Sequence, residues 1–202
     1  MREEGIKPTE HILNRYSEIN LSQWKLLELG KLTREEVLVR RYEILFQEVG
    51  MSCDAKKISE KYEDFLGEGH YFIPGAKELL EDLSKKYHLY LASNGAVKVQ
   101  MSRIQSAGIE KYLEKIFLSE QIGYEKPSPQ FFEKCFAQIP DFKKEEALIL
   151  GDSLTSDIRG GKNAGILTVW FHPSGKKVEE EIVPDYEIGK LEELKTILSF
   201  YS

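Results

Sequence analysis

The chain lacks the features that mark secreted, membrane and nucleic-acid-binding proteins. Its 202 residues include two cysteines, Cys53 and Cys135, too few for a disulfide framework, so we expect a reducing, cytoplasmic location. No apolar run approaches the roughly 20 residues that span a bilayer, and the first residues carry no signal-peptide core. The 28 Lys and Arg residues against 34 Asp and Glu residues give a net charge of -6, which argues against a basic stripe for nucleic acid. We expect a monomer or a dimer without nucleic-acid or membrane partners.

The first third of the chain has only helical patterns. Apolar residues at helical spacing predict helices over 12–19, 21–29, 33–50 and 58–67. The third helix begins with T-R-E-E, in which Thr33 and Glu36 have the spacing of a capping box. Trp24 could stack on a ring ligand, but filling the core is the commoner role for a tryptophan on a small helical unit.

From Gly69 onward, strand and helix patterns alternate. Strands are predicted over 88–92, 116–118, 147–150, 167–171 and 186–188, and helices over 79–87, 97–107, 129–139 and 191–198. Ser128 and Pro129 have the character of an N-cap and a first helical residue. Alternation of this kind predicts an α/β fold, a Rossmann-like parallel sheet flanked by helices. We therefore divide the chain into a small all-helical region, 1–68, and an α/β core, 69–202.

The most informative stretch is A-L-I-L-G-D-S-L-T-S-D-I-R-G-G-K-N-A-G, residues 147–165. Its strand stops at Gly151, Asp152 lies just beyond the strand end, and Asp157 follows where a helix should begin. Ligands of open α/β sheets bind beyond such strand ends, and close carboxylates there suit Mg²⁺. Taken singly, Asp152 could be a turn former, and Asp157 a carboxylate stabilised by the helix dipole.

Two further loops offer groups that bind anions. Ser93, Asn94 and Gly95 follow a strand and precede a helix, where unpaired N–H groups favour negative charge. A plain capped turn is an equally good interpretation of that loop alone. Lys126 could neutralise a phosphate or a carboxylate nucleophile, although an isolated lysine is usually a solvated surface group. Their order at successive strand ends, ahead of Asp152, favours a functional site.

A different hydrolase motif can be rejected. Residues 151–154 spell G-D-S-L, which marks a lipase and esterase family with a nucleophilic serine. That family places the motif near its N-terminus and D-x-x-H late in the chain. Here the only later histidine, His172, has Val169 three positions before it. No catalytic triad can therefore be assembled around Ser153.

The set Ser93, Lys126-Pro127, Gly151-Asp152 and Asp157 resembles the haloacid dehalogenase (HAD) superfamily of phosphohydrolases. S-N-G, E-K-P-S-P-Q-F-F and the 151–165 stretch look closest to its YjjG-like pyrimidine nucleotidase group. The resemblance implies that residues 69–202 are a HAD-like core and 1–68 an N-terminally incomplete helical cap. It also implies roles for individual residues. Ser93 would bind the transferring phosphoryl group with help from the main chain of Asn94 and Gly95, and Lys126 would balance charge on the nucleophile and the phosphate. Asp152 would ligate Mg²⁺, and Asp157 would support Lys126 and the metal shell. An aspartate at 152, where dehalogenases tend to carry serine, favours the phosphatase branch.

The chain departs from this family in one respect. The family's first motif, D-x-D-x-T, carries the aspartate nucleophile on the middle strand of the sheet, and no D-x-D occurs in these 202 residues. A buried strand of about four large apolar residues contributes on the order of 10 kcal/mol, the whole net stability of a typical domain. We therefore expect the natural protein to be longer by about one strand and part of a cap helix. We expect the chain as given to be inactive.

Three hypotheses follow for function. The first is a Mg²⁺-dependent phosphohydrolase of a small phosphorylated metabolite, such as a nucleoside 5'-monophosphate, acting through an aspartyl-phosphate. The second is a short form that binds a phosphorylated ligand without turnover. The third is a phosphonatase or phosphomutase on the same scaffold. A phosphonatase needs a Schiff-base lysine from the cap, for which Lys25 and Lys31 are weak candidates.

Overall fold

The structure of the protein is a computed structural model that describes residues 9–175 and 181–201. The chain divides into two compact units, Met1–Glu68 and Gly69–Ser202, and each is described here by itself. Within the described residues, no helix is both long enough and apolar enough to cross a membrane.

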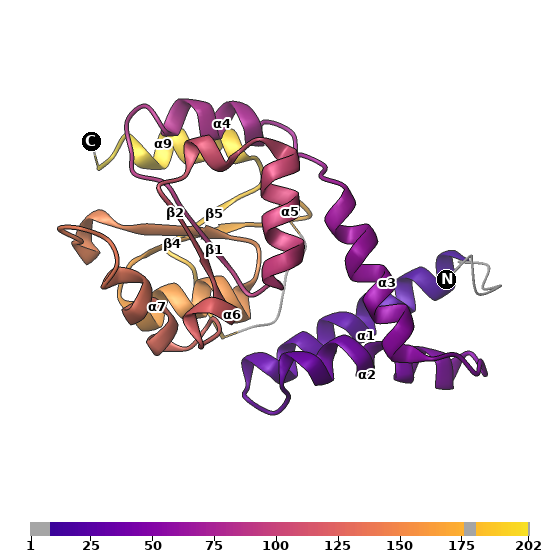
Figure 1. Cartoon of the computed structure of the whole chain (residues 1–202). Coiled ribbons are helices and arrows are strands. Elements are labelled where there is room, and N and C mark those ends of the chain that lie inside the picture. The colour runs from indigo at the N-terminus through magenta and orange to yellow at the C-terminus, as the bar shows by residue number, and fades with distance from the viewer. Residues whose placement is uncertain (1–8, 176–180, 202) are drawn as a thin grey trace. The chain divides into compact units, whose positions relative to one another are not determined.

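The helical unit is built from α1 (Glu10–Glu28), α2 (Arg34–Glu48) and α3 (Ala55–Glu68) (Figure 1). The capping box is confirmed, because Thr33 accepts from the Glu36 main chain while the Glu36 carboxylate accepts from the Thr33 main chain. The prediction of separate helices over 12–19 and 21–29 is wrong. No glycine or proline interrupts the sequence there, and the Asn20 side chain bonds to Trp24 and Arg41 instead of capping a second helix.

Three tyrosine rings pack together in the helical unit. Tyr42 is fully buried, and its ring lies 5.4 Å from that of Tyr16 and 6.1 Å from that of Tyr62. Burial of side chains of this size stabilises a fold by about 1.5–3 kcal/mol each. Trp24 is half-buried and donates its Nε1–H to Asn20 Oδ1 at 3.1 Å, so its hydrogen-bonding group is used within the unit.

The α/β unit contains the predicted alternation of strands and helices. Its strands are β1 (Tyr90–Ser93), β2 (Lys115–Leu118), β3 (Leu148–Gly151), β4 (Leu167–Phe171) and β5 (Tyr186–Ile188), each within two residues of its predicted bounds. Its α-helices are α4 (Ala76–Leu83), α5 (Val97–Ala107), α6 (Ser119–Ile122), α7 (Pro129–Phe136), α8 (Arg159–Ala164) and α9 (Leu194–Leu198). Short 3-10 helices occupy Glu110–Tyr112, Lys144–Glu146 and Leu191–Glu193, and Leu154–Ile158 forms a turn of π-helix.

All strand pairs are parallel, as the alternation predicts. The strands form two sheets, in the order β1-β2 and β3-β4-β5, and β1 and β3 do not pair with each other in the described part of the chain. Burial follows this division. The central strand β4 is buried along most of its length, whereas every residue of β1 and β3 is only half-buried. Both strands are thus incompletely covered although they belong to the interior of an α/β fold.

Helices cover the two faces of the strands (Figure 1). On one face, α4 and α9 pack against β3, β4 and β5 through a cluster that includes Leu79, Val169, Ile188 and Ile197. On the other face, α7 contributes Phe131, Phe132 and Cys135 to a cluster that also contains residues of β1, β2 and β3. The second cluster joins the two sheets although their strands do not pair.

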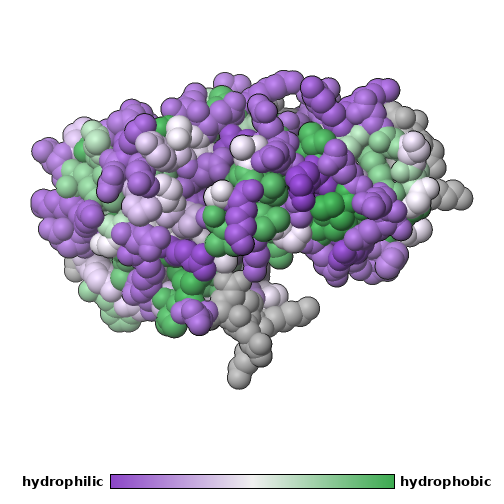
Figure 2. All heavy atoms as spheres, turned by 90° about the horizontal axis from the view of Figure 1, so that it is seen from below, coloured by the Kyte–Doolittle hydropathy of each residue, from purple (hydrophilic) through white to green (hydrophobic). Residues whose placement is uncertain are grey.

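Pro129 is the first residue of α7, as predicted, and Ser128 occupies the N-cap position. The Ser128 hydroxyl does not cap the helix, however, because it donates to Gln130 Oε1 at 2.6 Å. The face drawn in Figure 2 is mainly hydrophilic, with hydrophobic areas separated by hydrophilic residues. Such scattered apolar exposure is ordinary for a protein surface.

Candidate active site

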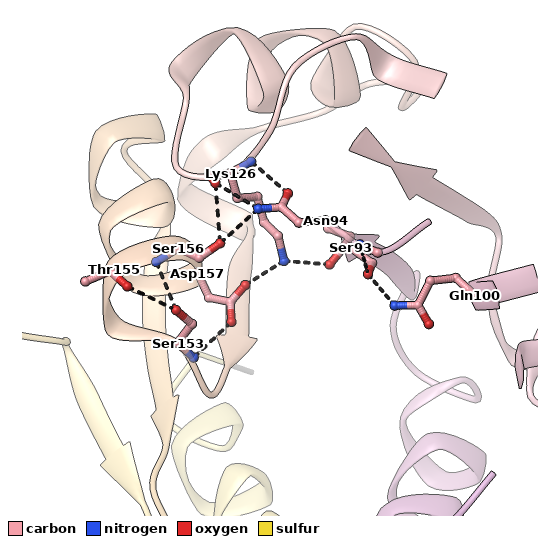
Figure 3. Close-up of polar contacts among 10 residues, drawn as sticks. Ser93, Asn94, Gln100, Lys126, Ser153, Thr155, Ser156 and Asp157 are labelled. Carbon is pink, nitrogen blue, oxygen red and sulfur yellow. Dashed lines mark hydrogen bonds and ion pairs between the residues drawn. The ribbon is translucent and has the colours of Figure 1, made fainter. Parts of the chain in front are cut away.

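The predicted site residues gather where β1 and β3 end. Ser93 is the last residue of β1, Gly151 is the last of β3, and Asp152 follows it. Lys126 bridges these two places, since its ammonium donates to the main-chain oxygen of Ala92 at 2.7 Å and to Asp157 Oδ1 at 2.6 Å (Figure 3). The structure therefore brings residues from three separate loops to one edge of the unit.

Lys126 is unusual for a lysine because it is only 7% exposed. A lysine ammonium has three N–H groups, and two of them donate to Ala92 O and Asp157 Oδ1. The third finds no acceptor among the described residues. The prediction of a solvated surface lysine is therefore excluded, and a positive charge with one spare donor lies at the end of β1.

Each carboxylate oxygen of Asp157 accepts a hydrogen bond. Its Oδ1 accepts from Lys126, and its Oδ2 accepts from the Ser153 main-chain N–H at 3.1 Å (Figure 3). It lies in the first helical turn after β3, as predicted, and this turn is the π-helical segment Leu154–Ile158 that leads into α8. Gly151 makes room for it, since a Cβ at that position would lie 2.3 Å from the Asp157 carboxylate. Asp157 is therefore placed to hold Lys126 and has no oxygen free of these partners.

Asn94 holds the main chain of Lys126. Its Nδ2 donates to Lys126 O and its Oδ1 accepts from Lys126 N, both at 2.9 Å (Figure 3). A second contact runs from Nδ2 to Ser156 Oγ at 3.4 Å. The Asn94 carboxamide thus fixes the lysine loop against the end of β1, and the contribution of the Asn94 main chain to phosphate binding stays a prediction.

The Ser93 hydroxyl has its proton available. Its oxygen accepts from the Gly95 main-chain N–H at 3.0 Å and from Gln100 Nε2 at 2.5 Å. A hydroxyl has two acceptor positions and one donor, so both acceptor positions are occupied while the O–H can donate outward. The Gly95 N–H already donates to the Ser93 hydroxyl. Two donors therefore remain for an anion at the end of β1, the Ser93 O–H and the spare N–H of Lys126.

Asp152 has the opposite character from Asp157. It is exposed, and its carboxylate forms no hydrogen bond or ion pair with any described residue. Its main-chain oxygen accepts from Trp170 Nε1 at 3.0 Å. The described residues include no group of three or more His, Cys, Asp or Glu side chains able to hold a metal ion. Asp152 therefore fits Mg²⁺ as one oxygen ligand, and the described residues alone do not complete a coordination shell.

Several residues of this arrangement escaped the sequence analysis. Gln100, Ser153, Ser156 and Trp170 all contact a predicted site residue. The contacts of Ser156 and Trp170 join segments distant in sequence, whereas those of Ser153 and Gln100 are local but follow no residue pattern that the sequence alone displays. Cys135, the buried cysteine of α7, is not a reactive group here: burial raises the pKa of its thiol to about 12, and the Lys126 charge offsets only part of that rise.

Comparison with known proteins agrees with this geometry. Residues 2–171 match the family of haloacid dehalogenase-like hydrolases. The chain belongs to this family. It is 41% identical over 197 residues to the HAD-hydrolase YfnB of Bacillus subtilis, covering 98% of this chain and 84% of YfnB. It is 35% identical over 195 residues to the pyrimidine 5'-nucleotidase PynA of Streptococcus pneumoniae, covering 96% and 82%. Identity to the pyrimidine 5'-nucleotidase YjjG of Escherichia coli is 26% over 183 residues, covering 91% and 80%.

Solved structures support the same assignment. A crystal structure of YfnB bound to magnesium superimposes with a TM-score of 0.92 over 98% of this chain and 86% of that chain, at 41% identity. A 2-haloacid dehalogenase of Pseudomonas syringae shares the fold at a TM-score of 0.64 and 23% identity, covering 98% and 84%. The fold class and the family predicted from the motifs are thus confirmed, and the protein is a HAD-like hydrolase.

Proposed function

We propose that this hydrolase is a phosphohydrolase that releases phosphate from a small phosphorylated metabolite, with a pyrimidine nucleoside 5'-monophosphate as the substrate class. The observation that carries the proposal is the pair of unpaired donors at the end of β1. A buried ammonium with one free N–H, beside a serine hydroxyl whose proton is free, suits the oxygens of a phosphoryl group. The relatives PynA and YjjG, both pyrimidine 5'-nucleotidases, support the substrate class.

Each predicted residue takes a defined role in this proposal. Ser93 and Lys126 bind the phosphoryl oxygens, and Gly95 orients the Ser93 hydroxyl. Asn94 holds the main chain of Lys126, and Asp157 holds its ammonium. Asp152 is one oxygen ligand of Mg²⁺, which when bound would neutralise charge on the phosphate. Free thiols at Cys53 and Cys135 support a cytoplasmic location.

The nucleophile is the remaining part of the proposal. In HAD enzymes a D-x-D motif supplies the attacking aspartate. No D-x-D sequence occurs in the 202 residues of this chain. We propose that this aspartate lies on a strand upstream of the chain that fits between β1 and β3. Two features support this position: β1 and β3 do not pair within the described residues, and both are half-buried from end to end. A strand there would satisfy the main-chain groups of both edges.

The test compares two lengths of the protein. A form extended by the D-x-D strand should release phosphate from UMP and dUMP in the presence of Mg²⁺, and the 202-residue chain should not. Asp152→Asn should reduce release by the extended form at least a hundredfold, whereas Glu133→Gln, an exposed carboxylate change on α7, should leave it unchanged. Activity that survives Asp152→Asn would overturn the assignment of Asp152.

A second function is favoured by one observation, the lack of D-x-D in the chain. Without a nucleophile, the same donors would bind a phosphorylated ligand and not turn it over. In that case UMP should raise the melting temperature of the 202-residue chain, and Ser93→Ala should lower that rise. Phosphate release by the 202-residue chain itself would exclude this alternative.

A further inference from the structure

Trp170 connects the candidate metal ligand to the body of the sheet. It lies on β4 directly beside Gly151 of β3 in the strand register, and it is 8% exposed. Its indole Nε1–H donates to the main-chain oxygen of Asp152 at 3.0 Å. A side chain of the neighbouring strand β4 therefore holds the main-chain oxygen of Asp152.

The same indole ring also supports the turn that carries Asp157. Trp170 forms a small buried cluster with Leu154 and Ile158, the first and last residues of the π-helical turn. Asp157 lies within that turn, one residue before Ile158. A single side chain thus contacts both the segment of the free carboxylate and the segment of the carboxylate paired with Lys126.

The indole ring also has an aromatic partner just after the end of its own strand. His172 stacks on Trp170 with ring centroids 3.9 Å apart and an interplanar angle of 16°. Both imidazole nitrogens have partners, since Nδ1 lies 3.0 Å from Glu187 Oε1 and Nε2 lies 2.7 Å from Ser174 Oγ. These contacts fix the His172 plane, and the stack in turn limits rotation of the indole.

We propose that Trp170 is a positioning residue that sets the relative placement of Asp152 and Asp157, with His172 as its support. The inference rests on the proposed function for the importance of the two aspartates but not for the contacts themselves. Loss of the indole N–H would release the Asp152 main chain from β4 while Lys126 still holds Asp157. The loop between the two carboxylates would then sample several arrangements in place of one.

The first experiment measures hydrogen exchange of the loop amides, residues 151–158, in the full chain. Trp170→Phe keeps an aromatic ring but removes the N–H, and should speed exchange of these amides about tenfold, the effect of one hydrogen bond. Trp24→Phe is the matched control, because it removes an indole N–H that donates to Asn20 in the helical unit. It should leave the loop unchanged. His172→Leu should give a smaller increase than Trp170→Phe. Equal loop exchange in the Trp170→Phe and Trp24→Phe proteins would overturn the proposal.

The second experiment separates this inference from the metal assignment. In the Trp24→Phe protein all tryptophan fluorescence comes from Trp170, since the chain contains two tryptophans. Added Mg²⁺ should change that fluorescence, and calorimetry should show weaker Mg²⁺ binding after Trp170→Phe than after Trp24→Phe. Equal Mg²⁺ affinity in the two variants would contradict the positioning role. A lack of any Mg²⁺ response in the unsubstituted chain would instead count against Asp152 as a ligand in this chain, and the loop exchange would still decide the role of Trp170.

Discussion

Among residues 9–175 and 181–201, each unit of the molecule buries one cationic side chain, and the two side chains have different partners. In the helical unit, Arg41 is 4% exposed and has neutral partners: Leu38 O, Asn20 Oδ1, and the rings of Tyr42 and Tyr62. It forms no ion pair with a described carboxylate. In the α/β unit, Lys126 is 7% exposed and pairs with the equally buried carboxylate of Asp157.

The difference shows that a buried charge is not by itself a sign of function. The Arg41 guanidinium contacts two tyrosine rings and two oxygen acceptors, and these contacts tie α1 to α2 and α3. The Lys126 ammonium is a compact charge that keeps a spare donor at the end of β1, where it also contacts the main chain of Ala92. We therefore regard Arg41 as a structural residue and Lys126 as part of the candidate active site. The following substitutions test that contrast.

The largest effect is expected from Asp157→Ala. This change leaves the Lys126 ammonium buried without its carboxylate and the Ser153 N–H without its acceptor, and it should lower the free energy of unfolding by about 3–5 kcal/mol. Urea denaturation measures the change. The double variant Lys126→Met/Asp157→Ala removes the unpaired charge and should be more stable than Asp157→Ala alone. A double variant no more stable than the single one would show that charge burial is not the cause.

Gly151→Ala should have the next largest effect. The new Cβ would lie 2.3 Å from Asp157 side-chain atoms, so the carboxylate would be pushed away from Lys126. Overpacking of this kind typically costs about 1–3 kcal/mol, and we expect the upper end of that range. Gly69→Ala is the control, because its Cβ would meet only Tyr71, at 3.8 Å, and should be nearly neutral. Similar melting temperatures for the two alanine variants would contradict the predicted crowding.

Arg41→Met should cost about 2 kcal/mol of unfolding free energy. It removes a charged hydrogen bond to Asn20 and the contacts with two tyrosine rings, but it leaves no buried charge unpaired. The exposed neighbour Arg40→Met should change stability by less than about 0.5 kcal/mol. Phosphate release by the extended protein, corrected for the folded fraction, should stay at its original level in Arg41→Met. If Arg41→Met lowered phosphate release by more than it lowered the amount of folded protein, Arg41 would have a functional role. The proposed difference between Arg41 and Lys126 would then be wrong.

Asp185→Asn should have the smallest effect and a defined pH dependence. Burial by itself would raise the pKa of Asp185, but the Lys162 ammonium and hydrogen bonds from Thr168 outweigh it and hold the pKa below the ordinary 3.8. A carboxylate with a lowered pKa stabilises the fold above its unfolded pKa and loses that contribution as the pH falls through the folded pKa. The variant should therefore be about 1 kcal/mol less stable than the original at neutral pH.

That difference should remain nearly constant from pH 7 to pH 5 and shrink below pH 3.8. Urea denaturation at several pH values would show it, with Glu133→Gln as an exposed control. A difference that grows as the pH falls would reverse the sign and refute this account of Asp185.

Much of the fold was predictable because its signals are local. Strands β4 and β5 have their predicted bounds, helix α5 does as well, and the capping box at Thr33 is present. Each depends on side chains within a few residues of one another. One error has a related origin: the apolar residues of 12–29 predict two helices, but the structure has one helix there, in which the Asn20 side chain bonds to Trp24 and to Arg41 of another helix.

The candidate site was predicted in composition and only partly in arrangement. The order of Ser93, Lys126, Asp152 and Asp157 along the chain indicated a family and a phosphate site, because the carboxyl ends of parallel strands share one edge. Their individual roles in catalysis remain predictions. The use of Asn94 to hold Lys126 could not be predicted, because that contact joins segments 32 residues apart in the chain. The contact of Gln100 with Ser93 spans seven residues but depends on how the start of α5 turns back over the end of β1.

The sequence by itself determined the alternation of strands and helices, the helical first third, the order of the site residues and the lack of a D-x-D motif, since all of these are written in local pattern and composition. Only the tertiary structure decided which aspartate pairs with Lys126 and which has a carboxylate unpartnered among the described residues. Asp152 and Asp157 are chemically identical and five positions apart, yet one is exposed and the other is buried against Lys126. That distinction arises from packing across β1, β3 and β4, where distant segments supply the partners, and no spacing along the chain specifies it.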